Sequence, residues 1–201
     1  MQIEIKINGL DKLVAKLKDF PVALKRAIRN ATDTTATAVK NIAVKEAERT
    51  FNVAKARLTK TSKGSPTIYV KRTTQTEQHA TVTFKGGAGA KAGDRPGLQH
   101  YATNKPPRKR TKGWKPAYRI RRAGMTEDVE RGFYGEGKLK GQGIFQREIG
   151  SKKIVRRTGP GIKQIVERRE VMSVVKREGE EVFKAKVVEA VGKQLKKLKG
   201  K

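Results

Sequence analysis

Cysteine is absent from this sequence of 201 residues, which excludes disulfides, thiolate zinc sites and cysteine nucleophiles. Histidine is almost absent as well, because only His79 and His100 could serve as imidazole bases or metal ligands, and they lie in different segments. Aromatic residues make up only 5% of the chain. A chain without cysteine suits a reducing cytosol, and it equally suits a particle that must survive outside a cell.

Long hydrophobic runs are also missing. The longest apolar stretches extend over only a few residues, whereas a membrane-spanning helix needs about 20. Residues 2–8 alternate polar and apolar side chains and lack the continuous apolar region of a secretory signal. We therefore expect neither a membrane span nor a signal peptide.

Acidic residues are few compared with basic ones. The chain has 48 Lys and Arg against 19 Asp and Glu, a formal net charge of +29. Hydrophobic residues make up 35% and charged residues 33%, which predicts a modest core under a surface crowded with cations. This excess indicates polyanionic neighbours or a solvated surface of one sign, and the charge alone does not say which.

The first half of the sequence predicts a strand followed by helices. Residues 2–8 alternate with a period of two, and apolar residues at 10–17 recur with helical spacing. Residues 22–50 carry a long apolar stripe of period 3.6, in which small Ala and Thr would permit the close approach of another element. A short basic helix at 53–58 would be capped by Asn52.

The remainder predicts short strands and a last helix. Segments 66–70 and 80–84 are expected to form antiparallel neighbours, and 117–122 and 144–150 are expected to be further strands. A helical region begins at 162, and a helix over about 170–198 has a plausible kink or break near Gly179.

The predicted fold class is α+β, with a small antiparallel or mixed sheet packed on the long helix, a C-terminal helix and a long basic loop rich in Gly and Pro. We expect one domain over 1–201, in which 86–116 is a flexible basic insertion and 193–201 a frayed basic tail.

No arrangement of residues predicts a catalytic site. Most acidic residues stand beside Lys or Arg, which is typical of a solvated or ion-paired surface. His100 has no partner for nucleophilic or metal chemistry and is interpreted as an ordinary loop histidine. A nuclease would need clustered carboxylates, and the only tight group, Glu127, Asp128 and Glu130, is more typical of a helix start. We expect no enzymatic activity, no cofactor and no metal.

Two glycine motifs favour structural roles. Gly86-Gly87-Ala88-Gly89 follows a strand, as a phosphate-binding loop would, but neither a helix pattern nor a Gly-Lys-Ser/Thr ending follows it. We interpret this motif as a flexible loop. Gly143 is expected at a turn or bulge where the chain enters a strand.

The strongest functional signal is the basic segment, residues 105–122. Nine of its 18 residues are Lys or Arg, none is acidic, and aromatic residues are interleaved. Such a pattern can neutralise phosphates and stack on bases, although the segment could instead dock on an acidic protein and Trp114 could simply anchor it to the core. The candidate DNA-contacting or partner-contacting residues are Lys105, Arg108, Lys109, Arg110, Lys112, Trp114, Lys115, Arg119, Arg121 and Arg122. Known modules for reading base sequence are missing from the pattern.

Several ordered motifs resemble one protein family. The opening Ile-Glu-Ile-Lys-Ile-Asn-Gly-Leu-Asp-Lys-Leu and the later Phe-Pro-Val-Ala-Leu-Lys-Arg-Ala resemble the minor tail protein Z of tailed phages. The similarity continues in Val44-Lys45-Glu46-Ala47 leading to Phe51-Asn52-Val53, in Gly143-Ile144-Phe145-Gln146-Arg147, and in Ile154-Val155-Arg156-Arg157-Thr158-Gly159-Pro160. It is strongest in the first 55 residues and around 143–166, and weakest at 86–142.

This resemblance implies a structural virion protein of a long-tailed phage that acts in tail completion and head–tail joining near the neck. It implies assembly as a ring around the DNA passage, commonly six-fold, with tail terminator, tail tube and head-completion proteins as partners and the DNA end as a further one. The protein would then be assembled in the host cytoplasm and reside in the virion tail or neck. The alternative is a stand-alone basic nucleic-acid-binding protein without sequence readout.

Overall fold

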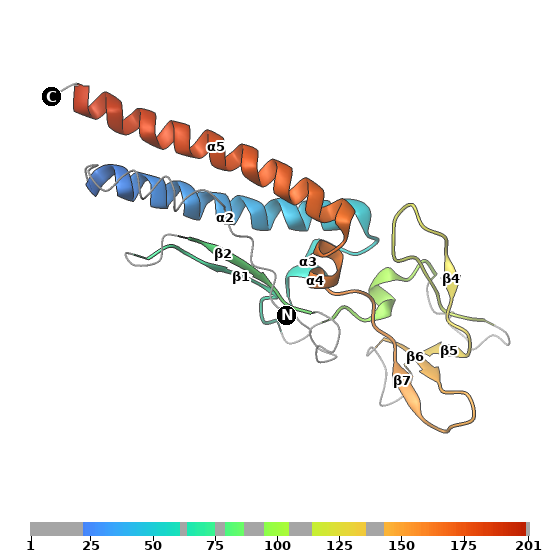
Figure 1. The fold of residues 1–201 in the computed structure, drawn as a ribbon. Helices are drawn as coiled ribbons and strands as arrows, with labels where there is room; N and C mark the ends of the chain where they lie inside the picture. The colour runs from blue at the N-terminus through green and yellow to red at the C-terminus, as the bar shows by residue number, and fades with distance from the viewer. Residues whose placement is uncertain are drawn as a thin grey trace. The chain divides into compact units, whose positions relative to one another are not determined.

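The computed structural model describes residues 22–60, 64–74, 79–86, 95–104, 114–135 and 143–199. The patterns noted at 2–8 and 10–17 lie outside these residues. The chain forms two compact units, the first from 1–46, 68–84 and 166–201 and the second from 47–67 and 85–165. Figure 1 shows a long helix, small antiparallel sheets and a last helix, which confirms the α+β class. One domain over 1–201 stays a prediction beside this division.

Helix α2, Val22–Thr50, follows the predicted stripe. Its buried face in the first unit consists of Ile28, Ala31, Thr32, Thr35, Ala36, Val39, Ala43, Val44 and Glu46. The hydroxyls of Thr32 and Thr35 donate hydrogen bonds to the carbonyls one turn earlier, at 3.0 and 2.8 Å, so burial leaves neither hydroxyl without a partner. Weak helix formers are therefore tolerated here, because packing holds the helix.

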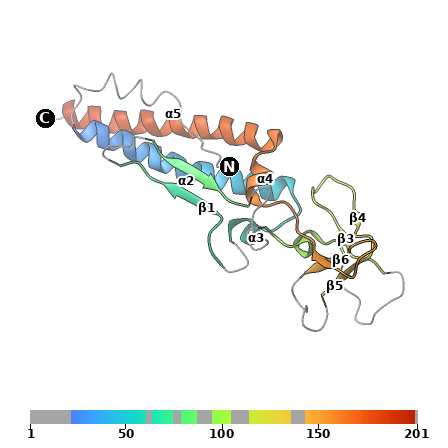
Figure 2. The same ribbon diagram turned by 60° about the horizontal axis from the view of Figure 1, so that its bottom comes forward.

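Helix α5, Arg169–Lys199, runs antiparallel beside α2 in both ribbon views (Figures 1 and 2). It continues through Gly179 without interruption, so the break considered at this position is wrong. It also includes residues 193–199, and the frayed tail expected at 193–201 stays a prediction.

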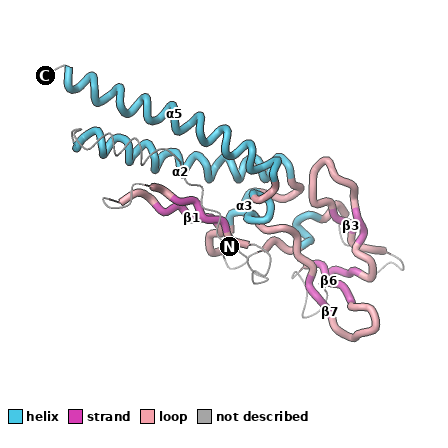
Figure 3. The backbone as a smooth tube through the Cα atoms, in the orientation of Figure 1, coloured by secondary structure: helices cyan, strands magenta, loops and turns pink. Residues whose placement is uncertain are grey.

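The hairpin of the first unit is the predicted antiparallel pair. Strand β1, Ile68–Lys71, pairs with β2, Thr81–Phe84, in the register Ile68↔Phe84 and Val70↔Val82. Asp33 of α2 accepts a hydrogen bond from the backbone N–H of Thr73 at 2.8 Å, which fastens the end of β1 to the helix. In Figure 3 the hairpin follows α2 on the side away from α5.

The second unit is built from short elements. They are α3 Lys55–Thr59, the 3₁₀ helix η2 Leu98–Tyr101, β3 Ala117–Tyr118, β4 Glu127–Asp128, β5 Gly132–Tyr134, β6 Ile144–Arg147, β7 Ile154–Arg156 and α4 Ile162–Val166, whose last residue belongs to the first unit. Strands β5, β6 and β7 form an antiparallel sheet in that order, and β3 pairs with β4. The largest buried side chains include Tyr101, Phe51, Leu58 and Ile144.

Several local predictions in this unit are wrong. Asn52 does not cap α3; the carboxylate of Glu48 accepts from the N–H of Lys55 at 3.2 Å, and the amide of Asn52 donates to the carbonyl of Tyr101. Residues 127–128 form a strand rather than a helix start. The strand expected at 117–122 ends at Tyr118, because the next residues turn back toward the end of α2.

The expectation for Gly143 agrees with the structure. Gly143 has a φ of +121° directly before β6, as expected for a glycine that admits the chain to a strand. Among the helices that the structure describes, none combines the length and apolar character needed to cross a membrane.

Candidate functional site

The basic segment is described only from Trp114 onward. Lys105, Arg108, Lys109, Arg110 and Lys112 lie outside the described residues. The other five candidates, Trp114, Lys115, Arg119, Arg121 and Arg122, are in the second unit around β3. The structure therefore shows how the C-terminal part of the segment is held.

Asn104 joins the two ends of the stretch 105–113. Its amide nitrogen donates to the carbonyl of Lys115 at 3.0 Å, and its amide oxygen accepts from the N–H of Ala117 at 2.9 Å. The carbonyl of Asn104 accepts in turn from the hydroxyl of Tyr134 at 3.1 Å. The side chain of Asn104 thus ties the two ends of this stretch together, and its backbone carbonyl ties them to β5.

Trp114 packs on this same base. Its ring and that of Tyr134 have centroids 5.7 Å apart with an interplanar angle of 32°. Burial raises the pKa of the Tyr134 hydroxyl. The indole is half-buried, so one part of it anchors the segment while another part faces solvent.

Two of the described cations already have partners within the fold. The guanidinium of Arg122 donates to the carbonyl of Glu48 at 2.9 Å, at the C-terminal end of α2, where a cation is favoured by the helix dipole. The guanidinium of Arg119 donates to the hydroxyl of Thr126 at 3.3 and 3.4 Å. Lys115 and Arg121 are exposed. A polyanion would thus meet Lys115 more readily than Arg119 or Arg122, whose guanidinium groups already donate hydrogen bonds within the fold.

The acidic residues of this region do not gather. Glu127 and Asp128 are consecutive in β4, so their side chains project to opposite faces of the strand. Glu127 accepts a hydrogen bond from the hydroxyl of Tyr118 at 2.6 Å, and this bond is the first cause that raises the pKa of Tyr118 to about 12. In the described part of the chain no three His, Asp or Glu residues are placed to hold a metal ion.

A group of two arginines and one histidine that the sequence did not indicate lies elsewhere in the second unit. His100 in η2 is half-buried, and its pKa is lowered first by burial and then by the charges of Arg57 and Arg156. These three residues come from α3, η2 and β7. Nothing in the local sequence around any one of them predicts the group, because only the tertiary fold brings them together.

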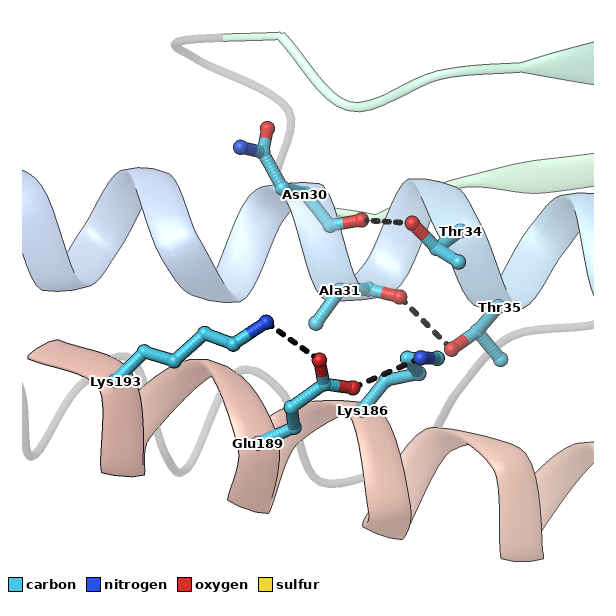
Figure 4. A network of polar contacts seen from close by, with 7 residues as sticks. All are labelled: Asn30, Ala31, Thr34, Thr35, Lys186, Glu189 and Lys193. Carbon is cyan, nitrogen blue, oxygen red and sulfur yellow. Dashed lines mark hydrogen bonds and ion pairs between the residues drawn. The ribbon is translucent and has the colours of Figure 1, made fainter.

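The first unit has a polar groove between α2 and α5. Its volume is about 630 Å³, and its lining includes Arg26, Asn30, Lys186 and Lys193. Figure 4 shows Glu189 between two lysines, accepting from Lys186 at 2.8 Å and from Lys193 at 2.6 Å. These bonds lower the pKa of Glu189 to about 2. The carboxylate therefore stays charged and holds both ammonium groups on the α5 wall of the groove.

Comparison of this chain with protein-family models, with curated proteins and with solved structures finds no match.

Proposed function

We propose that this protein is a structural component of a long-tailed phage virion, acting in tail completion and head–tail joining at the neck. It works as a homo-oligomeric ring, with six copies as the proposed number, around the DNA passage and contacts tail terminator, tail tube and head-completion proteins. It is assembled in the host cytoplasm and remains in the tail or neck. The role includes no catalytic step and no cofactor.

The outer half of α5 is the observation that carries the assembly part of this proposal. Beyond Gly179, no side chain described on this helix is fully buried. Val182, Phe183, Val187 and Val191 are only half-buried, and Val188 is 72% exposed. Apolar side chains left in this condition favour burial against another chain. A second copy of this protein is the partner that a ring supplies.

Charge sets a condition on that assembly. Copies that each carry a net charge of +29 repel one another, so a ring of them needs counter-charge. DNA in the central passage, or acidic faces of neighbouring rings, would supply it. The basic segment, fastened to the fold at Asn104 and Trp114, is the surface proposed to meet that counter-charge.

The direct test is to prepare particles that lack this protein and image them by negative-stain electron microscopy. Filled heads and separate tails of full length are expected, and supplying the protein in trans should restore joined particles. Normally joined virions in its absence would show that the proposed role is wrong.

The basic segment has a matched test. Serine is placed at Lys105, Arg108, Lys109, Arg110 and Lys112 in one variant. A control variant loses five exposed cations elsewhere, at Lys45, Lys152, Arg168, Arg169 and Lys176. Infectivity should fall in the first variant and persist in the control. Equal infectivity of the two variants would show that the basic segment has no role in head–tail joining. Arg122 is not replaced in either variant, because its guanidinium holds the end of α2.

The alternative, a stand-alone nucleic-acid-binding protein, is favoured by the exposure of Lys115, the residue that follows Trp114. It predicts monomers that bind DNA of any sequence, with log affinity falling linearly in log salt at a slope of about −0.9 per phosphate contacted. The ring proposal predicts instead that sedimentation shows self-association when salt or a polyanion screens the charge. Sedimentation and DNA titration over one salt series separate the two.

A further inference from the structure

Three segments of the second unit are held together around His100. The N–H of Leu98, at the start of η2, donates to the carbonyl of Arg157 at 3.0 Å, which places η2 beside the end of β7. The amide of Asn52 donates to the carbonyl of Tyr101 at 3.4 Å, which places η2 beside the turn that leads to α3. One backbone hydrogen bond and one from the Asn52 side chain therefore hold the 3₁₀ helix of His100 beside β7 and beside the turn before α3.

The Nε of Arg156 is buried and has no hydrogen-bond partner among the described residues. Burying an unpaired donor of a charged group costs free energy, because the group loses its hydrogen bonds to water and gains none in the protein. No ion pair with a carboxylate of the described residues involves Arg57, His100 or Arg156. The group thus combines positive charge with an unused buried donor.

Gln99 adds a second unpaired atom at the same place. Its Nε2 lies 3.3 Å from the Nε2 of His100, whereas its buried Oε1 has no partner among the described residues. A Cβ at Gly97 or at Gly143 would overlap the Gln99 carboxamide, so these two glycines make room for it. If the carboxamide turns over, its oxygen can accept from a protonated His100, which both satisfies the oxygen and allows the imidazole to carry charge.

We propose that Arg57, His100 and Arg156 form a binding site for a phosphate oxyanion. The ligand chemistry is that of inorganic phosphate and of the phosphodiesters in a nucleic acid backbone. Arginine suits such a ligand because its planar guanidinium presents several donors to the tetrahedral oxygens. The Nε of Arg156 gains its missing acceptor, and the repulsion among the three groups is relieved. A phosphate would bind here whether or not the protein acts in a phage tail.

The test is a titration of the isotopically labelled protein with inorganic phosphate, followed by NMR at constant ionic strength. The resonances of the Arg156 Nε–H and the His100 ring should shift with saturation. Arg156→Gln should weaken binding about tenfold, as expected for the loss of one charge-assisted hydrogen bond. Because Arg57 is exposed, Arg57→Gln leaves the fold intact and should also weaken binding about tenfold.

The matched control is Lys152→Gln, which removes one positive charge from an exposed position in the same unit. It should change the affinity by less than about twofold, because an exposed charge in water contributes little. Absence of a saturable shift at Arg156 and His100 would overturn the proposal. Equal weakening by Lys152→Gln and Arg57→Gln would overturn it too, since binding would then follow net charge alone.

A competition arm distinguishes the two sources of phosphate. A short single-stranded oligonucleotide is added to the phosphate-loaded protein and to its Arg57→Gln variant. Displacement of phosphate, with oligonucleotide binding weakened in the variant, assigns the site to a nucleic acid backbone. Simultaneous binding of both ligands assigns it to free phosphate, and either result supports the oxyanion site.

Discussion

The backbone of Gly179 in α5 lies directly against the side chain of Val39 in α2. A Cβ at position 179 would stand 2.9 Å from the Val39 Cγ2, closer than real Cβ contacts are. Val39 is almost fully buried, and a β-branched side chain in a helix has one strongly preferred rotamer. Position 179 therefore has little room for any side chain larger than hydrogen.

Gly179→Ala is expected to destabilise the protein even though alanine is the better helix former. Overpacking against Val39 costs about 1–3 kcal/mol, whereas the gain in helix propensity is about 1 kcal/mol, so a net loss of about 1 kcal/mol follows. The free energy of unfolding, from urea denaturation followed by circular dichroism, measures it.

Gly192→Ala is the matched control in the same helix. Among the described residues, no atom beyond the neighbouring turns of the same helix lies within 4 Å of a Cβ there, so this change should stabilise by up to about 1 kcal/mol. The added change Val39→Ala should relieve the overlap in Gly179→Ala, giving a favourable coupling in a double-mutant cycle. Stabilisation by both glycine changes would contradict the close contact.

Asn104→Ala is expected to loosen the base of the basic segment. It removes two hydrogen bonds, to Lys115 and Ala117, and should cost about 1–2 kcal/mol. Trp114 is the only tryptophan of the chain, so its emission reports the change directly and should shift toward that of solvated indole. Asn104→Asp retains the acceptor for the N–H of Ala117. Its stability and its tryptophan emission should therefore lie between those of the wild type and of Asn104→Ala. Unchanged emission in Asn104→Ala would show that the packing of Trp114 does not depend on the Asn104 hydrogen bonds.

Ionisation of Tyr118 should depend on Glu127. In the folded protein the pKa of Tyr118 is raised from 10.0 to about 12, first by its hydrogen bond to the Glu127 carboxylate. Because the folded pKa lies above the unfolded value, the stabilising effect is complete below pH 10 and is lost as pH rises toward 12. Ultraviolet titration measures this ionisation, with Tyr118→Phe to identify its contribution. Glu127→Gln should return the Tyr118 pKa toward its ordinary value, and an unmoved titration would contradict the pairing.

Removal of the Glu189 charge should destabilise the part of α5 that lines the groove, because the bonds from Lys186 and Lys193 are weakened. Bonds from Lys186 and then Lys193 lower the pKa of Glu189 from 4.5 to about 2. Its stabilising effect is therefore present above pH 4.5 and is lost as pH falls toward 2. Glu189→Gln should lower the melting temperature at neutral pH, and added salt should reduce the difference because both lysines are solvent-accessible.

Glu180→Gln is the control for that change. Glu180 is also exposed on α5, so both variants raise the net charge of a strongly basic chain equally. Glu189 accepts hydrogen bonds from two lysines, whereas no such bond to Glu180 is found among the described residues, so replacement of Glu189 should have the larger effect. If the two variants had equal melting temperatures, the effect of Glu189→Gln would come from the change in net charge and not from the bonds to Lys186 and Lys193.

Local pattern was sufficient for the long elements. The period of α2 and the alternation in β1 and β2 gave the correct element types, because each has one buried face over several residues. Strands β5 and β7 were missed, since three residues are too few to show a period and glycines surround the first. The cap of α3 was missed because Glu48 supplies it from the preceding helix, seven residues away.

The candidate sites divide in the same way. The basic segment stands out in composition because its nine cations lie within 18 successive residues. The group of Arg57, His100 and Arg156 has no such signal, since α3, η2 and β7 become neighbours only through tertiary contacts. The sequence also does not show which cations have partners within the fold. Arg122 is one example, since only the structure shows its hydrogen bond to the end of α2.

Because the two units interleave in the sequence, they can fold only in a certain order during synthesis on the ribosome. Residues 47–165 contain the whole second unit, which can close while the chain is still being synthesised. The first unit cannot, because α2 emerges early and its partner α5 is translated after all other described elements. The part of α2 that packs on α5, as Val39 does on Gly179, therefore stays without that partner until about 120 further residues have been synthesised.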